Sequence, residues 1–407
     1  MTRRPGTHAM FAALAAMYCL SQFFRSSTAL IAVDLSREFH LGPERLSLLG
    51  AAFFYAFALA QIPLGPALDR FGARRILLGA AAVGAVGSAL FGLATGWPAL
   101  VAGRVLMGLG MAPVLMGTLK LAAQWLPAHR FGTASGTILA VGTLGSLLAA
   151  SPLAALAGAI GWRASFGLFT AATAVGAGAL AWLVRDPPTT DTSPQPVAPV
   201  PGSGLFRVVR QGNFWAMAPL AAAGYASIAS LQSLWAGPFL MESLRYARSE
   251  AGAILLALGL ASALGTAVSG HLSDRVLRSR KWVVILGNTA AVVLLLPLLG
   301  VGAPRSALGW GIVFSLLGFF AAFRTLVYTH VKETVPLELA GTAVTAVNFF
   351  IMMGPALVQQ GMGAVLGAYP GQYRLAFWIP FAALAVADAA YLFTRDTHPS
   401  RLPYRQP

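Results

Sequence analysis

The chain contains 407 residues, of which 57% are hydrophobic and only 10% are charged, and its mean hydropathy is +0.71. Soluble domains carry about 25% charged residues, so this composition excludes a soluble protein and indicates one embedded in a lipid bilayer. The net charge of +15 does not indicate a nucleic-acid partner, because the basic residues lie between apolar runs and not in a soluble domain.

The apolar runs are about 20 residues long, which is the length of a membrane-spanning helix and twice that of a barrel strand. In chain order, the first six predicted spans run at about 9–33, 47–68, 76–96, 98–122, 131–155 and 164–184. The last six run at about 213–240, 251–272, 282–302, 307–330, 340–366 and 372–394. We therefore predict an all-α membrane protein with twelve transmembrane helices in two pseudo-symmetric six-helix bundles.

The segment between the two sets of spans has a different composition. RDPPTTDTSPQPVAPVPGSG, residues 185–204, is rich in Pro, Thr and Ser and cannot bury a core. We predict an N-terminal bundle at 1–184, a linker at 185–212 and a C-terminal bundle at 213–407.

The orientation of the chain follows from its basic residues, since short cytoplasmic loops are enriched in Lys and Arg. The loops on the side of the N-terminus carry most of them. We expect a multi-pass protein of the cytoplasmic (inner) membrane with both termini and the linker in the cytoplasm. Cys19 is the single cysteine, so no intrachain disulfide is possible.

Two loops in the two halves repeat one another. The loop after the second span reads GPALDRFGARR, residues 65–75, and the loop after the eighth reads GHLSDRVLRSRK, residues 270–281. The matching Gly, Asp and Arg residues are separated by a constant offset of 205 positions. A six-span unit repeated with the same topology is typical of transporters whose substrate site lies between two halves.

The first loop resembles the signature loop between helices 2 and 3 of the major facilitator superfamily. The fourth span supplies a second family motif, RVLMGLG, and GWR at 161–163 a third. The resemblance covers essentially the whole chain, and the second loop departs from the pattern, with Leu277 where the first has Gly72. The residues that carry the resemblance are Gly65, Asp69, Arg70, Gly72, Arg74, Arg75, Arg104, Gly108 and Gly110.

The loop motif also has a physical interpretation. We expect Gly65 to permit a close helix approach and Asp69 to cap a helix or pair with arginines, in a contact that holds one conformer and breaks in another. The alternative is a basic loop that only fixes topology. The residues expected to act in gating are Gly65, Asp69, Arg70, Gly72, Arg74, Arg75, Asp274 and Arg275.

The first span carries a polar stripe. Tyr18, Ser21, Gln22 and Arg25 recur at helical spacing on one face. An arginine inside a bilayer costs about 2.5–3.5 kcal/mol on insertion scales. The alternative to a substrate site is an arginine that extends to the headgroups, but a lipid-facing stripe would be apolar. The family resemblance implies that helices 1, 4, 7 and 10 line the cavity.

Further candidates lie in later spans. Arg324 is in GFFAAFRTLVYTH, with Tyr328 one turn beyond it on the same face. Because spans one and ten belong to different halves, we expect Arg25 and Arg324 to bind one ligand from two sides. The remaining candidates are Tyr225, Gln232 and Trp235 of the seventh span and Asn348 of the eleventh, although amides in membrane helices often only join neighbouring helices.

The remaining charged residues in the spans indicate the sign of the ligand. Arg104 belongs to the fourth-span motif, with a structural or coupling role, and Lys120 is expected to extend to the interface. Asp388 is the only acid we place inside a span, so the predicted cavity holds arginines and no carboxylate. Guanidinium groups bind carboxylate or phosphate bidentately, and we therefore expect an anionic ligand.

A departure from a family pattern bears on energy coupling. FFRSS in the first span departs from the Asp-Arg pair at the corresponding place in sugar-acid:proton symporters of the superfamily, since Arg25 matches the carboxylate-binding arginine but Phe24 occupies the place of the protonatable acid. We therefore do not expect proton coupling through this position. Anion exchange, facilitated diffusion and a proton route through His330 or Asp388 all remain open.

The leading hypothesis is a secondary active or exchange transporter of a small, carboxylate-like organic anion. The alternative is an exporter of drugs or siderophore-like metabolites, although the fifth span has no Gly-Pro pair of the kind that drug antiporters of the family carry. A receptor on the same fold would need additional soluble domains. No nucleotide loop, metal cluster or nucleophile motif is evident, so we expect no enzyme, no cofactor and no metal, and a monomer.

Overall fold

The computed structural model of the protein describes residues 6–185, 207–336 and 339–397. In this part of the chain every regular element is a helix, and twelve helices are long and apolar enough to cross a membrane. The all-helical class with twelve spans, predicted from sequence, is confirmed.

The chain divides into two compact units, one comprising Met1–Asp191 with Gln232–Ala253 and the other Thr192–Leu231 with Ile254–Pro407. The predicted linker lies mostly outside the described residues, so the predicted division at 185–212 stays a prediction.

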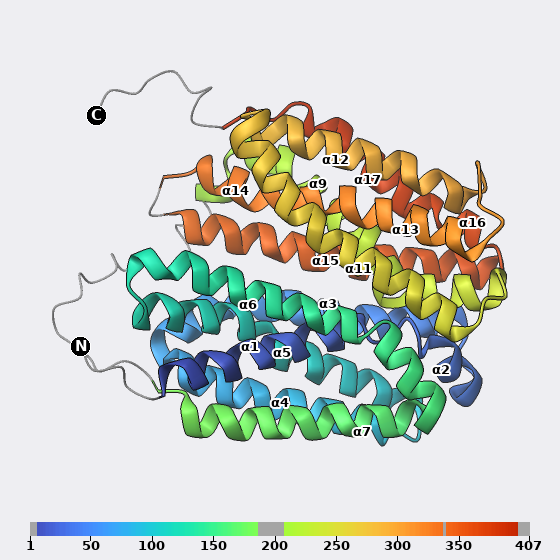
Figure 1. Ribbon diagram of the computed structural model, residues 1–407, viewed down its shortest axis with the longest axis horizontal. Helices are drawn as coiled ribbons and strands as arrows, with labels where there is room; N and C mark the ends of the chain where they lie inside the picture. Colours follow the sequence, from blue (N-terminus) through green and yellow to red (C-terminus); the bar gives the residue numbers. More distant parts are fainter. Residues whose placement is uncertain (1–5, 186–206, 337–338, 398–407) are drawn as a thin grey trace. The chain divides into compact units, whose positions relative to one another are not determined.

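The first unit contains the helices drawn from blue to green in Figure 1. Their bounds are α1 Thr7–Ser26, α2 Ala32–Phe39, α3 Pro43–Phe71, α4 Ala73–Gly92, α5 Trp97–Trp125, α6 Ala128–Leu148 and α7 Ser151–Leu183. Small residues bring these helices together, as is usual in membranes. A Cβ on Gly87 of α4 would lie 2.6 Å from the backbone nitrogen of Met107 in α5, so only glycine allows this approach.

Two helix boundaries in this unit differ from the sequence expectation. α1 ends at Ser26 and not at residue 33, since a run of hydroxyl side chains competes for the backbone there and Ser27 Oγ donates to the carbonyl of Phe24 at 3.2 Å. α7 begins at Ser151, well before residue 164, and bends at Gly161, whose φ is 80°. Arg25 therefore lies in the last turn of its helix.

The short helix α2 is held by side chains from two other elements. Arg163 and Trp162, which follow the bend in α7, donate to the Glu38 carboxylate at 2.6 Å and 2.7 Å. Arg248, at the start of α11 (Arg248–His271), pairs with Asp34 at 2.5 Å. Trp162 and Arg163 of the GWR motif thus hold α2 against α7.

The second unit is built mainly from the later helices. They are α9 Gly212–Ser230, α11 Arg248–His271 from Ile254 onward, α12 Arg280–Leu295, α13 Ala307–Ala321, α14 Leu326–Glu333, α15 Ala340–Ala368, α16 Tyr373–Ala376 and α17 Trp378–Tyr391. α9 packs against α15 and α17, and Gly354 of α15 approaches the backbone of Ala222 in α9.

Several spans of the second half change helix type along their length. The seventh continues from α9 through two π-helical stretches, Leu231–Trp235 and Phe239–Ser243, and the tenth passes from α13 to α14 through the 3₁₀ turn Ala322–Thr325. Such irregular stretches often occur at functional sites.

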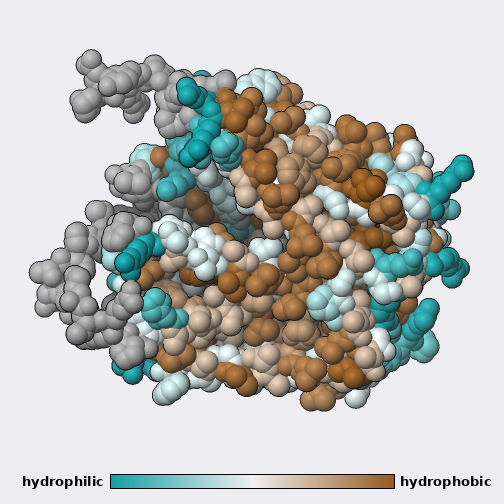
Figure 2. Space-filling model, viewed as in Figure 1, coloured by the Kyte–Doolittle hydropathy of each residue, from teal (hydrophilic) through white to brown (hydrophobic). Residues whose placement is uncertain are grey.

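The surfaces of the helices fit a bilayer. In Figure 2, hydrophobic residues cover the middle of the helices and hydrophilic residues gather at their ends. Large apolar side chains on the outside include Leu93, Val175, Trp182, Leu308 and Val386. Such surfaces are stable in lipid and not in water.

Candidate functional site

Arg25 lies over an aromatic ring of a neighbouring helix. Its guanidinium carbon is 4.8 Å from the centroid of Phe57 in α3, a cation–π distance. The side chain is half-buried in the last turn of α1, where the carbonyl end of the helix dipole favours a cation. Both contacts reduce the cost of an arginine within a span.

Arg104 of α5 ties this turn to two other helices. It is fully buried, its Nη1 donates to the carbonyl of Phe24 at 2.8 Å, and its Nε donates to the carbonyl of Leu49 in α3 at 3.4 Å. Its guanidinium also lies 5.0 Å from the Phe53 ring. Because Phe24 directly precedes Arg25, Arg104 positions the turn that carries Arg25.

The rest of the predicted stripe on α1 turns toward neighbours in the same unit. Ser21 Oγ donates to the carbonyl of Met111 in α5 at 3.4 Å, and Tyr18 is buried against Gly142 of α6, where a Cβ would overlap its ring. Gln22 is half-buried, and its Oε1 accepts no hydrogen bond from the described residues. Gln22 is therefore the member of the stripe whose side chain keeps an acceptor that no described residue uses.

Gln232 and Trp235 lie on the first π-helical stretch of the seventh span. Trp235 is 1% exposed, whereas Gln232 is half-buried. Both belong to the same unit as Arg25, while Tyr225, seven residues before Gln232, belongs to the unit of Arg324.

Arg324 repeats the arrangement seen at Arg25. It lies in the 3₁₀ turn between α13 and α14, and its guanidinium carbon is 4.4 Å from the centroid of the Tyr225 ring in α9. Gly224 leaves room beside it, since a Cβ there would be 3.5 Å from Arg324 Cδ and 3.5 Å from Oδ1 of Asn288 in α12. Arg324, Tyr225 and Asn288 thus converge on one glycine.

Tyr328 and Asn348 form a pair next to this group. The Tyr328 hydroxyl donates to Asn348 Oδ1 at 2.7 Å and joins α14 to α15. The structure therefore brings together two residues that the sequence placed on separate spans.

Phe57, Gly224 and Asn288 were not predicted from the sequence. Asn288 is an amide in an apolar span, and this signal could have identified it. Phe57 and Gly224 cannot be distinguished from the many other phenylalanines and glycines of the spans, because their importance depends on the arginine that packs beside them.

The first loop motif uses a glycine to begin a helix. Gly72 has a φ of 80° and caps α4, and Arg74 donates to the carbonyls of Val184 at 2.7 Å and Ala181 at 3.0 Å at the end of α7. No described atom lies within 4 Å of a Cβ built on Gly65. Arg70 and Arg75 are exposed, and the side chain of Asp69 lies outside the described residues.

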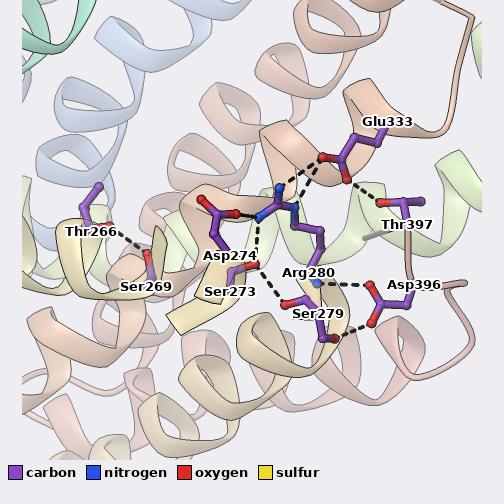
Figure 3. A network of polar contacts seen from close by, with 9 residues as sticks. All are labelled: Thr266, Ser269, Ser273, Asp274, Ser279, Arg280, Glu333, Asp396 and Thr397. Carbon is purple, nitrogen blue, oxygen red and sulfur yellow. Dashed lines mark hydrogen bonds and ion pairs between the residues drawn. The ribbon is translucent and has the colours of Figure 1, made fainter. Parts of the chain in front are cut away.

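The second loop motif forms a network of charges (Figure 3). Arg280 pairs with Asp274 and, at 3.3 Å, with Glu333 of α14, and it donates to Ser273 at 2.9 Å. Arg275 is exposed. Arg280, which matches Arg75 in the repeat but was not among the predicted gating residues, therefore carries the ion pairs of this loop.

Residues that follow α17 complete the network. Asp396 accepts from the backbone nitrogen of Arg280 at 3.0 Å and from the hydroxyl of Ser279, and Thr397 donates to Glu333 at 2.8 Å. A carboxylate at the N-terminus of α12 offsets the partial positive charge of that helix end.

Comparisons with known proteins agree with this architecture. The family model described as the Major Facilitator Superfamily matches residues 14–359 and again residues 228–406. A probable sulfoacetate transporter of Cupriavidus necator is 24% identical, over 95% of this chain and 93% of that protein. A probable L-galactonate transporter of Escherichia coli is 30% identical, over 35% of this chain and 31% of that protein.

Among solved structures, an inward-facing, unoccupied bacterial homologue of the human lysosomal transporter Spinster superposes with a TM-score of 0.80. The two chains are 20% identical, and the superposition covers 96% of this chain and 97% of the other. At this identity the match establishes the fold alone.

Proposed function

The chain belongs to the major facilitator superfamily, and from this premise we propose that it is a secondary transporter that moves a small organic anion across the cytoplasmic membrane by alternating access. The relatives favour this substrate class, since sulfoacetate and L-galactonate, named for two of them, are both organic anions. The alternative of a drug or siderophore exporter is not favoured by these relatives.

The observation that carries the proposal is the pair of arginines held inside spans. Arg25 lies over Phe57 and Arg324 over Tyr225, each in a turn where its helix ends or changes type. Aromatic faces lower the cost of a cation without neutralising it. A guanidinium placed in this way binds a carboxylate or sulfonate through charge-assisted hydrogen bonds.

The polar residues around the arginines then orient the substrate. In this proposal Gln22, Tyr18, Gln232 and Trp235 act with Arg25, while Tyr225, Tyr328 and Asn348 act with Arg324. Arg104 has a positioning role through Phe24.

The repeated loops and the termini complete the proposal. The two loop motifs act in gating, both termini and the linker lie in the cytoplasm, and the coupling ion is a proton or a counter-anion. The protein acts as a monomer.

Uptake into proteoliposomes tests the function. Purified protein is assayed by counterflow with labelled sulfoacetate, galactonate, galactarate and glucuronate, and with a cationic dye as the competing substrate class. We expect at least one organic anion to be exchanged and the dye to be ignored. Transport of the dye alone would contradict the proposal.

Two substitutions test the site. Arg25→Ala and Arg324→Ala each remove a charge-assisted contact worth about 1.5–3 kcal/mol, so transport efficiency should fall about 10- to 100-fold. Arg305→Ala, at an exposed loop arginine, is the matched control and should transport like the wild type. Wild-type transport by both site variants would refute the anion-binding roles.

A further inference from the structure

Among the described residues of the second unit, Asp388, Tyr391 and His330 are titratable side chains that are buried and are not among those proposed to bind the anion. Asp388 and Tyr391 lie one turn apart on α17, and His330 lies on α14. Asp388 is 8% exposed, and the other two are completely buried. Buried ionisable groups in membrane spans are functional candidates by default.

Asp388 has only part of the environment that a carboxylate needs. Its Oδ2 accepts a hydrogen bond from the hydroxyl of Thr289 in α12 at 2.7 Å. Its Oδ1 is buried and has no hydrogen-bond partner among the described residues. A buried, half-satisfied carboxylate costs several kcal/mol, and such a group becomes neutral when it can. The conformation described here therefore favours the protonated carboxyl.

Among the described residues, no cation on the elements packed against α17 pairs with the Asp388 carboxylate. α9 has Tyr225 as its only titratable residue and α15 has none, while Tyr373 and Arg374 of α16 lie near the opposite end of α17. On α12, Arg280 pairs with Asp274 and Glu333, and Lys281 donates to the carbonyls of Leu392 and Thr394. Within the described residues no ion pair is formed by Asp388.

Asp388 is connected to the surroundings of Arg324 through α12. Thr289, its hydrogen-bond donor, directly follows Asn288, whose Oδ1 flanks Gly224 together with the Arg324 side chain. A change in the charge of Asp388 thus acts on Thr289, the residue next to Asn288, and Asn288 lies near Arg324, the proposed anion-binding arginine.

His330 and Tyr391 form a hydrogen-bonded pair near the end of the unit that the sequence predicts to be cytoplasmic. His330 Nε2 lies 2.7 Å from the carbonyl of Arg395, which only accepts, so this nitrogen carries the hydrogen. Nδ1 is then the acceptor, and the Tyr391 hydroxyl donates to it at 2.5 Å. Tyr391 shares a helix face with Asp388, and Arg395 is exposed.

We propose that Asp388 is the binding site of the coupling proton. The proposal rests on the proposed anion transport. The proton is carried as an O–H bond on the carboxyl, and it passes to water when a conformational change hydrates that group. Proton occupancy favours the conformation described here, and this difference in proton affinity between conformations couples proton movement to transport.

The test separates exchange from proton-driven uptake in proteoliposomes that contain a pH-sensitive dye. The substrate is whichever anion of the panel sulfoacetate, galactonate, galactarate and glucuronate the wild type exchanges fastest. We expect the wild type to show counterflow, accumulation driven by an inward proton gradient and acidification of the lumen. Asp388→Asn, which can still accept from Thr289, should retain counterflow within about twofold but lose accumulation and acidification.

The controls make the result decisive. Glu44→Gln changes an exposed carboxyl and should behave like the wild type. The proton site would be overturned, while the proposed function stands, if Asp388→Asn acidified the lumen as much as the wild type does. It would also be overturned if the wild-type protein showed counterflow but moved no protons. Absence of counterflow with every anion of the panel would instead refute the proposed function.

Thr289→Val supplies a second test that leaves the carboxyl in place. Loss of the hydroxyl removes a hydrogen bond that stabilises the ionised form, so the proton binds more tightly. The pH dependence of accumulation should move upward by roughly one unit, while counterflow remains. A pH profile identical to that of the wild type would contradict the role of Asp388.

Discussion

Arg25 in the first unit and Arg324 in the second both lie over an aromatic ring, but the groups around the two side chains differ. Beside Arg25, the buried Arg104 donates to main-chain carbonyls of α1 and α3. On the side of Arg324, the Asn288 amide flanks Gly224 together with the Arg324 side chain, and Tyr328, four residues on, is hydrogen-bonded to Asn348.

This difference distinguishes a rigid site from an adjustable one. Main-chain carbonyls are present whatever the side chains are, so the turn that carries Arg25 is fixed by the path of the backbone. Amides and hydroxyls change with single substitutions and can be repositioned by rotation. Under the proposed function, the contact at Arg25 is therefore the less adjustable of the two, and selectivity among anions is expected to depend more on the side chains near Arg324.

The two loop motifs show the same contrast. In the first, Gly72 adopts a φ of 80° and caps α4. In the second, Leu277 has a φ of −84°, and the side chain of Ser279 caps α12 by accepting from the backbone nitrogen of Trp282 at 3.0 Å. In the second loop the positive φ lies at Arg278, at 44°, and the cap comes from a side chain, so Leu277 can stand where the first loop has glycine.

Of the substitutions that test the comparison, Arg104→Met is expected to have the largest effect on stability and transport. The substitution removes the hydrogen bonds that Arg104 donates to the carbonyls of Phe24 and Leu49, and a hydrogen bond from a charged group contributes about 1.5–3 kcal/mol. The melting temperature in detergent should fall by about 5 °C, and uptake of the anion should be lost because the turn that carries Arg25 is no longer fixed. A stable, fully active Arg104→Met protein would show that the first site is not rigid.

Gly72→Ala should have an intermediate effect. A φ of 80° with a ψ of 153° is a conformation that essentially only glycine adopts, so alanine there costs about 1–3 kcal/mol. Leu277→Gly, at the matching position, should cost less than about 1 kcal/mol. Thermal unfolding of the two variants measures the contrast, and equal losses would remove the distinction between the loops.

The smallest effect is expected from Tyr328→Phe, which removes one neutral hydrogen bond worth about 0.5–1.5 kcal/mol. KM should rise by about 2- to 10-fold for some anions of the panel and less for others, with stability unchanged. Gln22→Ala in the first unit should instead change the KM values of all anions of the panel by a similar factor. The ratio of KM values across the panel measures this, and a uniform shift in Tyr328→Phe would contradict a selective second site.

The sequence identified the two arginines because a charge inside a span is costly and therefore conspicuous. It did not identify Phe57 or Gly224, whose types recur throughout the spans. It also placed the end of the first helix too late, because the hydroxyls of Ser26, Ser27 and Thr28 interrupt a run that hydropathy alone extends.

By itself, the sequence determined the membrane class, the twelve helices and the duplicated halves. These properties depend on the length and apolarity of single segments, since a chain in lipid must satisfy its backbone hydrogen bonds within each span. Only the tertiary structure decided that Arg104 holds the turn before Arg25, that Arg280 carries the ion pairs of its loop, and that Asp388 meets Thr289. Each of these contacts joins residues far apart in the chain, and their meeting depends on how whole helices pack.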